Sequence, residues 1–434
     1  MIRIVAGFPI KERMKPIDNS ERGPTGTLSL QLSESGIPEV SPARLDPSDR
    51  AGIQAHLHDH GFACVRGCMS QPELDHAEDL LWRHLEGVEE ASQRMAQKRP
   101  IGWRRGQPTT WREGHGDGLM TSTTHCASMW YVRARPGVIH AFHAAYGTED
   151  DAELVASYDR MAVNLPVSSG NAEALRVAAA TSHHGKFGVA QRMHTHVGQF
   201  YGPEFKGPEY YAIVPLFDMN RNTGATALVP GSHRKVEEIE RRWHQKWGLE
   251  SRGQLSAEEK LLAAADLEPF ERCGLTPSVT NIKAGDCVLF DTALFHGAYA
   301  AEDPTGGSGN GPNQLLRAIY ILGMAFTRLQ TREILAARRQ AYERDVFWPP
   351  TLAHAAFAQH ILAGKLDGPY DPSLRCLTRP SEVAEGTLEK ALQLNLVNRR
   401  GTRGEAFPRI RDFAKAEPVV QRLIDPTHAA AAPL

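Results

Sequence analysis

The sequence predicts a mainly β protein with helices, in which a double-stranded β-helix core of the jelly-roll or cupin kind is buttressed by α-helices. Four short strand-like pieces between residues 210 and 326 support this prediction: YYAIVPLF, GATALVPG, DCVLFDTALFHGA and LLRAIYILGMAF. The first three are bounded by the Gly, Pro or Asp residues that are typical of turns. Helix-like segments precede and follow the four pieces, and this order of elements favours two packed sheets surrounded by helices.

The composition is that of a globular protein without a strong charge preference. The 434 residues are 41% hydrophobic and 23% charged, and 49 basic side chains nearly balance 51 acidic ones. This balance argues against attraction to a nucleic acid polymer or an anionic membrane. No apolar run reaches the ~18 residues of a membrane-spanning helix, and the first residues lack the apolar core of a signal peptide. We therefore expect a cytoplasmic protein.

Cysteines are spread along the chain without any Cys-x-x-Cys pair, which argues against a zinc site or a disulfide framework. Free cysteine is among the residues most often buried in protein cores. We therefore expect core thiols at Cys64, Cys68, Cys126, Cys273, Cys287 and Cys376.

The chain is expected to divide into three parts. Residues 1–45 contain PIDNSERGPTG and SESGIPEVSPAR, which are rich in Pro, Gly and Ser and predict an extended N-terminal segment. Residues 46–330 would form the jelly-roll domain. A helical insertion is expected within it at about 235–270, where KVEEIERRWHQKW and SAEEKLLAAADL are helix-like. Residues 331–434 would form a C-terminal helical extension packed on the core.

The first elements of the jelly-roll domain have recognisable start and stop signals. DPSDRAGIQAHLHDHG is helix-like, and FACVRGCM reads as a short strand that ends in a turn. A capping box from Ser70 to Glu73 then opens a helix with an apolar stripe. A further helix, PGVIHAFHAAYG, has Pro136 at its start and Gly147 just past its end, as helices favour.

The periodic spacing of apolar residues that is typical of helices and strands disappears between Arg99 and Tyr131. This segment carries Trp103, Trp111, several arginines and many hydroxyl groups. A long irregular segment is uncommon inside a compact domain unless it is functional, so we interpret it as a candidate substrate-covering loop. The alternative is a surface excursion packed by its two tryptophans.

The stretch QRMHTHVGQF, residues 191–200, has the pattern of one strand of a metal site. Because side chains alternate across a strand, His194, His196 and Gly198 would share one face. Iron-dependent oxygenases commonly place a His-x-Asp pair in this way, and a histidine from a distant strand completes a facial triad on Fe(II). In this chain Gly198 stands at the position of the aspartate.

From about residue 52 to residue 326 the sequence resembles the phytanoyl-CoA dioxygenase-like branch of the Fe(II)/2-oxoglutarate oxygenases. The resemblance lies in HDHGFACVRG, MWYVRARPGV, ALVPGSHRK and GDCVLFDTALFHG. The family pattern His-x-Asp-Gln matches His-Val-Gly-Gln at 196–199, so the resemblance implies His196 as the first iron ligand and Gln199 as a cofactor-binding residue. His296, within LFHGA, matches the distal iron ligand.

The resemblance also implies that Arg317 holds the far carboxylate of 2-oxoglutarate. Arginine suits a carboxylate because its planar fork makes two parallel charge-assisted hydrogen bonds. The 21 residues from His296 to Arg317 exceed the usual family spacing, and the loop EDPTGGSGNGPNQ absorbs the excess. The PGSH piece is interpreted as structural, with Gly231 turning the chain and Ser232 and His233 as hydrogen bonders within the loop.

Gly198 indicates which member of the superfamily the chain resembles. A glycine or alanine in place of the triad carboxylate is the mark of the halogenases, in which chloride takes the vacated coordination site. Glycine supplies neither a side chain to block that site nor a charge to repel an anion. The resemblance therefore implies an Fe(II)/2-oxoglutarate-dependent halogenase that uses O2 and chloride and chlorinates an unactivated C–H bond. Gly198 and His194 are the catalytic candidates.

Three other interpretations stay open. In the first, His194 or another side chain completes three protein ligands and the enzyme is a hydroxylase, although His194 lies on the wrong side of His196 to replace the aspartate. In the second, the missing carboxylate marks a metal-free binding module. In the third, the motif is accidental and its histidines are core residues.

The expected substrate is a small soluble molecule, with no carrier protein. Arginines at positions 104, 105, 112, 133, 160 and 192 would suit an anionic substrate, and Trp103, Trp111 or Phe200 could stack on a flat ring. Arg192, Phe200 and Trp111 are the substrate-binding candidates, and a nucleotide such as (deoxy)adenosine monophosphate is the first choice of substrate. Most of these arginines, taken individually, are expected to be solvated or paired with nearby acids.

Overall fold

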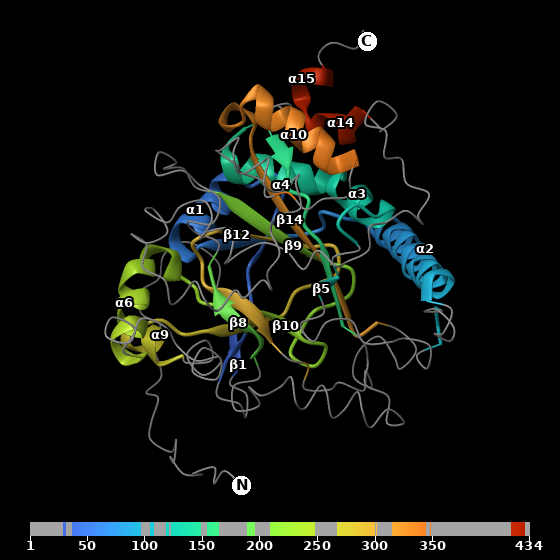
Figure 1. Cartoon of the computed structure of the whole chain (residues 1–434). Helices are drawn as coiled ribbons and strands as arrows, with labels where there is room; N and C mark the ends of the chain where they lie inside the picture. The colour runs from blue at the N-terminus through green and yellow to red at the C-terminus, as the bar shows by residue number, and fades with distance from the viewer. Residues whose placement is uncertain are drawn as a thin grey trace.

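The computed structural model describes only part of the chain. The described residues are 29–31, 37–96, 105–107, 119–120, 123–148, 154–164, 189–195, 209–247, 267–299, 301, 315–343, 348 and 418–429. Two β-sheets packed face to face form their centre, and most of the helices lie on the outer face of one sheet (Figure 1).

The larger sheet has eight strands among the described residues. In order across the sheet these are β3 (Arg44–Leu45), β4 (Phe62–Val65), β12 (Cys287–Asp291), β9 (Tyr210–Pro215), β14 (Arg317–Phe326), β7 (Met161–Asn164) and β5 (Leu119–Met120), with β6 (Leu154–Ala156) also paired to β14. Every pair is antiparallel except β3 with β4. The long strand β14 lies between β9 and β7, so its residues reach across the centre of the sheet.

The smaller sheet has six strands. In order these are β1 (Ser29–Gln31), β2 (Glu39–Ser41), β11 (Ser278–Thr280), β10 (Ala225–Leu228), β13 (His296–Tyr299) and β8 (Val189–His194). In Figure 1, β8 and β10 lie below β12, β9 and β14 of the larger sheet. The described core therefore confirms the prediction of a mainly β protein with a double-sheet, jelly-roll-like core and surrounding helices.

The helices of the described ranges come before, between and after the strands in the sequence. They are α1 (Arg50–His60), α2 (Gln71–Ala96), α3 (Ala127–Arg133), α4 (Pro136–Tyr146), η4 (Ser232–Arg234), α6 (Val236–Trp247), α9 (Glu268–Arg272), η5 (Thr327–Leu329), α10 (Arg332–Glu343), α14 (Pro418–Ile424) and α15 (Pro426–Ala429). None of the helices in the described ranges is both long enough and apolar enough to cross a membrane.

The helix ends follow the local sequence signals. At the start of α2, the backbone N–H and the hydroxyl of Ser70 both donate to the Glu73 carboxylate, at 2.8 and 2.9 Å, and the first of these bonds is one of the two that the predicted capping box contains. Pro136 begins α4, and Gly147 ends it with a φ of 72°, a left-handed conformation that favours glycine. These caps satisfy backbone groups that the helix itself leaves without partners.

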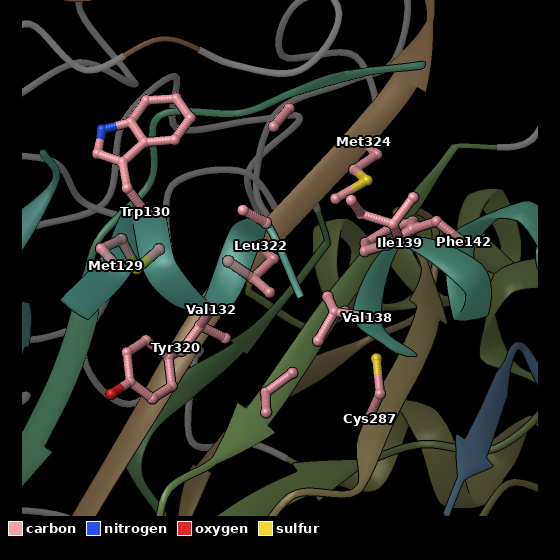
Figure 2. Packing of buried hydrophobic residues seen from close by; sticks show 14 of the residues in the cluster. Met129, Trp130, Val132, Val138, Ile139, Phe142, Cys287, Tyr320, Leu322 and Met324 are labelled. Atoms are coloured by element: carbon pink, nitrogen blue, oxygen red, sulfur yellow. The ribbon is translucent and has the colours of Figure 1, made fainter. Parts of the chain in front are cut away.

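Both faces of the larger sheet are buried. Side chains of β14 point alternately to one face and to the other. Tyr320, Leu322 and Met324 belong to a cluster with Met129 and Val138 of the helices (Figure 2). The residues between them on the strand face the smaller sheet, and Ile319 packs in a second cluster that contains residues of both sheets. Arg317 has the same parity as Ile319, so it also faces the smaller sheet.

Helices α6 and α9 pack against the chain just before β13. The ring of Trp243 in α6 lies 5.0 Å from that of Phe270 in α9 and 5.3 Å from that of Phe295, measured between centroids. All three side chains are fully buried. Because Phe295 directly precedes His296, this aromatic cluster supports the start of β13.

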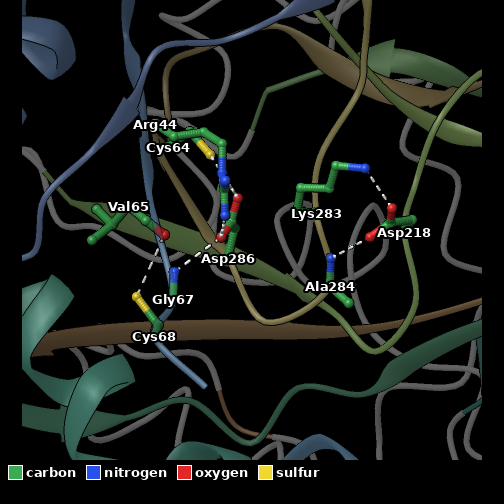
Figure 3. A network of polar contacts seen from close by, with 9 residues as sticks. All are labelled: Arg44, Cys64, Val65, Gly67, Cys68, Asp218, Lys283, Ala284 and Asp286. Carbon is green, nitrogen blue, oxygen red and sulfur yellow. Dashed lines mark hydrogen bonds and ion pairs between the residues drawn. The ribbon is translucent and has the colours of Figure 1, made fainter. Parts of the chain in front are cut away.

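The N-terminal strands are tied to the sheets by polar contacts. The Arg44 guanidinium of β3 donates to both carboxylate oxygens of Asp286, at 2.6 and 2.8 Å, and the Gly67 N–H donates to the same carboxylate at 2.9 Å (Figure 3). In the same region Asp218 accepts hydrogen bonds from Lys283 and from the Ala284 N–H. The predicted division into three parts stays a prediction, although β2 and β3, within its first part, pair with strands of the two sheets.

The described cysteines are buried and free, which confirms their interpretation as core thiols. They are Cys64, Cys68, Cys126, Cys273 and Cys287, whereas Cys376 lies outside the described residues. Burial raises the pKa of the Cys64 thiol well above its ordinary value. Such a thiol is uncharged at neutral pH and acts as a small apolar group.

Candidate active site

The candidate site lies between the two sheets, where β13 faces β12. His296 begins β13 and is 6% exposed. Its ring centroid is 4.6 Å from that of Phe290, which belongs to β12 of the larger sheet. The imidazole of His296 therefore points from the smaller sheet toward the larger one.

A short turn fixes the position of His296. The backbone N–H of Leu294 donates to the carbonyl of Asp291 at 2.8 Å, and the Ala293 N–H donates to the Asp291 carboxylate at 2.7 Å. The Phe295 N–H donates to the hydroxyl of Ser232 at 2.9 Å. These bonds satisfy the N–H groups of the three residues that precede His296, and they thereby fix the backbone position of His296.

Ser232 belongs to the PGSH piece, which the sequence predicted to be structural. Gly231 has a φ of 78°, and its N–H donates to the carbonyl of His60 at 2.9 Å. The Nε2 atom of His233 lies 3.0 Å from the carbonyl oxygen of His58. These contacts confirm that Gly231 turns the chain and that Ser232 and His233 form hydrogen bonds, and they show that these bonds reach His58 and Phe295 outside the loop.

The hydrogen bonding of His296 selects its tautomer. Its Nδ1 atom lies 2.9 Å from the carbonyl oxygen of Leu294. A carbonyl can only accept, so Nδ1 carries the proton, and in the neutral imidazole the lone pair is then on Nε2. This is the arrangement in which a backbone carbonyl orients a metal-binding imidazole.

Arg317 brings a positive charge into the same space. It is the first residue of β14 and is 4% exposed. Its Nη2 donates across the gap to the hydroxyl of Thr226 on β10, at 3.4 Å, whereas its buried Nε has no hydrogen-bond partner among the described residues. Burial alone lowers the pKa of Arg317 to about 10, which leaves the group charged at neutral pH.

A guanidinium in this position needs an anion. Buried arginines are almost always paired, because desolvating a charge without a partner is costly. In the part of the chain that the structure describes, no carboxylate forms an ion pair with Arg317. The site therefore fits an anionic group that comes from outside the described residues.

Strand register relates Arg317 to His296. On β10, Thr226 is the register partner of Ala298, and Leu228 is the register partner of His296. Residues directly opposite each other on paired strands point to one face, so Thr226 and His296 share the face toward the larger sheet. Two residues of strand span roughly 7 Å. Thr226, which Arg317 contacts, is thus two strand positions away from the residue opposite His296.

Asn164 is a further polar residue at this position. It ends β7 and is the register partner of Arg317 on β14. Its buried Oδ1 accepts no hydrogen bond among the described residues. Neither Asn164 nor Thr226 was predicted from the sequence to be a site residue. A polar residue inside an otherwise apolar strand, as in MAVN and ATAL, was the signal available for both.

The remaining predicted site residues lie at or beyond the described end of β8. The backbone of His194 lies opposite that of His296 on the neighbouring strand. Of His194 and Arg192 the structure describes the backbone only. The others lie outside the described residues: His196, Gly198, Gln199, Phe200 and Trp111. Within the described ranges, no group of three or more His, Cys, Asp or Glu side chains could hold a metal ion.

Several of the arginines considered for substrate binding have structural partners. Arg105 forms ion pairs with Glu78 and Asp79. Arg133 is fully buried and donates to the carbonyls of Thr124 and Asp159, both at 2.8 Å. These two residues follow the expectation that most of the arginines are individually paired. Positions 104 and 112 lie outside the described residues.

Comparisons with known proteins give a family match and several similar structures. No protein of curated function matches the sequence. The chain is similar to the epimerase SnoN in complex with Fe3+, alpha ketoglutarate and nogalamycin RO (15% identity, 64% of this chain and 84% of that chain, TM-score 0.36). It is also similar to HygX from Streptomyces hygroscopicus with nickel and 2-oxoglutarate bound (13% identity, 63% and 86%, TM-score 0.32). The model of the phytanoyl-CoA dioxygenase (PhyH) family matches residues 137–302, so this part of the chain, which contains His296, is similar in sequence to that family.

Proposed function

We propose that the chain is a non-haem Fe(II)/2-oxoglutarate-dependent oxygenase, and that it belongs to the halogenase subtype. The observation that carries the proposal is the pair of buried side chains between the sheets. His296 offers a ligand nitrogen, and Arg317 offers a charge that no described carboxylate neutralises. The sequence similarity of residues 137–302 to the phytanoyl-CoA dioxygenase family supports the same class.

The donor set fits iron. The Nε2 lone pair of His296 is a neutral imidazole donor of the kind that suits Fe(II). His196 is the proposed second ligand, and it lies two residues after His194, whose backbone faces His296 across β8 and β13. Iron bound there together with 2-oxoglutarate would supply the activation of O2 that oxidises a C–H bond.

Arg317 is the proposed partner of the far carboxylate of 2-oxoglutarate. Its Nε and Nη2 atoms lie on one edge of the planar guanidinium, and a carboxylate can accept from both at once. Burial excludes water from this ion pair, which strengthens the attraction. The cosubstrate would then extend from Arg317 toward His296, along the face that Thr226 and His296 share.

Gly198 carries the halogenase part of the proposal. No side chain at that position can provide the third protein ligand, and the site can then take chloride as a cofactor. The proposed substrate is a small soluble molecule, first of all a nucleotide such as (deoxy)adenosine monophosphate. Arg192, Phe200 and Trp111 are the proposed contacts for its phosphate and base. His194 is proposed to hydrogen-bond next to His196.

The product mass tests this proposal. The protein is incubated with Fe(II), 2-oxoglutarate, O2 and candidate nucleotides or amino acids, first with chloride and then with bromide. We expect succinate together with a product that carries the halide supplied. Gly198→Asp should abolish the halogenated product, because a carboxylate would occupy the halide site and repel the anion. A parent enzyme that gives only a hydroxylated product with either halide would contradict halogenation. Absence of iron binding and of succinate would instead favour a binding module.

A further inference from the structure

Asn164 and Arg317 form a polar pair on facing positions of two neighbouring strands. In β7 and β14, Asn164 is directly opposite Arg317, and Ala162 is opposite Ile319. The Leu316 N–H donates to the Asn164 carbonyl at 2.9 Å, which fixes the register at this end of the ladder. Ala162 and Ile319 both pack in the cluster between the sheets. The Asn164 side chain, two residues further along, therefore faces the same space.

Both members of this pair have a polar atom that is buried and not used. The Oδ1 of Asn164 and the Nε of Arg317 have no hydrogen-bond partners among the described residues, and they do not bond to each other. Buried polar groups in proteins are nearly always satisfied, so two neighbouring exceptions need a reason. A ligand that binds both residues would provide the reason.

A carboxylate is the ligand that satisfies both residues. The guanidinium donates to it directly. The carboxamide of Asn164 has a donor end and an acceptor end, and rotation by half a turn exchanges their places. Rotation brings Nδ2 to the position of the unsatisfied Oδ1, where it can donate to the second oxygen of a carboxylate held by Arg317. The Thr226 hydroxyl, which already accepts from Arg317, completes the polar surroundings.

We infer that Asn164 binds the far carboxylate of 2-oxoglutarate together with Arg317. This inference rests on the proposed function and deepens it. Asparagine suits this role better than a charged residue would. A lysine would repel Arg317, and a carboxylate would form an ion pair with it and leave no place for the cosubstrate.

Substitutions at Asn164 test the inference through binding, without turnover. The full chain is loaded with Mn(II), and the dissociation constant of 2-oxoglutarate is measured by calorimetry. Asn164→Ala should weaken binding about tenfold, since it removes one hydrogen bond to a charged group. Asn164→Asp should weaken 2-oxoglutarate binding about a hundredfold or more, because the new carboxylate forms an ion pair with the Arg317 guanidinium and competes with the cosubstrate.

A ligand control and a variant control isolate the effect. 2-Oxopentanoate has the same chain length but lacks the far carboxylate, so Asn164→Ala should leave its dissociation constant unchanged. Asn220→Asp makes the same charge change in a turn where Oδ1 accepts from the N–H groups of Asn222 and Thr223, and it should leave 2-oxoglutarate binding unchanged. Thermal unfolding adds an independent measurement: Asn164→Asp should raise the melting temperature of the ligand-free protein by pairing Arg317.

The outcomes separate the inference from the proposed function. If the parent binds 2-oxoglutarate and Asn164→Ala binds it equally well, the inference is wrong and the proposed function stands. Equal weakening of 2-oxoglutarate and 2-oxopentanoate by Asn164→Ala would also overturn the inference, because the role would then be structural. If the parent itself does not bind 2-oxoglutarate, the proposed function is wrong and the inference is lost with it.

Discussion

Arg317 is the residue on which the proposed chemistry depends most, and its burial predicts an unusual stability effect. Without its anion, a buried guanidinium lowers stability, and replacing it by an apolar side chain of similar length should help. We expect Arg317→Met to raise the free energy of unfolding by about 1 kcal/mol or more in the absence of 2-oxoglutarate. The same variant should lose the added stability that 2-oxoglutarate gives the parent. Urea unfolding with and without the cosubstrate measures both.

Arg338 provides the matched control. It is also fully buried, but its guanidinium donates to the carbonyls of Ala156, Leu423 and Ile424. Arg338→Met leaves these carbonyls without donors and should lower the free energy of unfolding by about 3 kcal/mol. If Arg317→Met destabilised the ligand-free protein as much as Arg338→Met does, the guanidinium of Arg317 would have a structural partner and no need of a ligand.

At the scale of elements, the end of α1 and the PGSH loop meet in a group of histidines that predicts acid sensitivity. Burial lowers the pKa of His56, His60 and His233 below the ordinary value of 6.5. Asp59 opposes this shift, whereas Arg234 adds to it at His60 and His233. The unfolded chain then binds more protons than the folded one below about pH 6.5.

The sign of the pH effect follows from this difference in proton binding. Stability from these histidines is fully present above the unfolded-state pKa and is lost as the pH falls from about 6.5 toward the folded-state values. We therefore expect the free energy of unfolding to decrease between pH 7 and pH 5. His56→Leu should reduce the slope. An unchanged slope in His56→Leu would show that the loss comes from other groups.

The aromatic cluster of α6, α9 and the residue before β13 links packing to the proposed metal site. Trp243 is fully buried, so Trp243→Ala should lower the free energy of unfolding by about 3 to 5 kcal/mol. Because the ring supports Phe295, the same change should also weaken iron binding at His296. Trp82→Ala in α2 removes a tryptophan that is also buried but lies away from this cluster, and it should destabilise without weakening iron binding. Equal iron affinity in the two variants would contradict the link.

At the scale of the whole molecule, Arg44 and Asp286 join parts of the chain that are 242 residues apart in sequence. The Asp286 side chain is fully buried, whereas that of Arg44 is half exposed. Removing the carboxylate leaves the Gly67 N–H without its acceptor. Arg44→Ala leaves the buried Asp286 carboxylate without its cation and should destabilise by about 1 to 2 kcal/mol, less than for a fully buried pair because Arg44 is half exposed. The double change Arg44→Ala, Asp286→Ala should cost less than the sum of the single changes, and thermodynamic cycles from urea unfolding check this.

Local features were accessible from the sequence because neighbouring residues determine them. The capping box at Ser70, the ends of α4 and the turn at Gly231 all depend on contacts within a few residues. His296 and Arg317 were accessible through resemblance to a known family. The structure adds that both are buried between the sheets.

The features that the sequence did not reveal depend on pairings between distant strands. Asn164 faces Arg317 only because β7 and β14 pair in one register, and a shift by one residue would turn it to the other face. Thr226 reaches Arg317 because the two sheets are stacked. The ion pair of Arg44 likewise depends on a parallel pairing of β3 with β4. The spacing of strands along the chain determines neither which strands pair, nor their register, nor how the two sheets stack.

The most direct test of the central claim is the visible absorption that appears when 2-oxoglutarate chelates Fe(II) in the absence of oxygen. We predict this absorption for the parent protein. His296→Ala should lose it because the metal loses a ligand, and Arg317→Met should require a much higher concentration of 2-oxoglutarate to develop it. Circular dichroism checks that both variants remain folded. If the parent shows no such absorption, or if folded His296→Ala shows it at parental intensity, the space between the sheets is not an Fe(II)/2-oxoglutarate site.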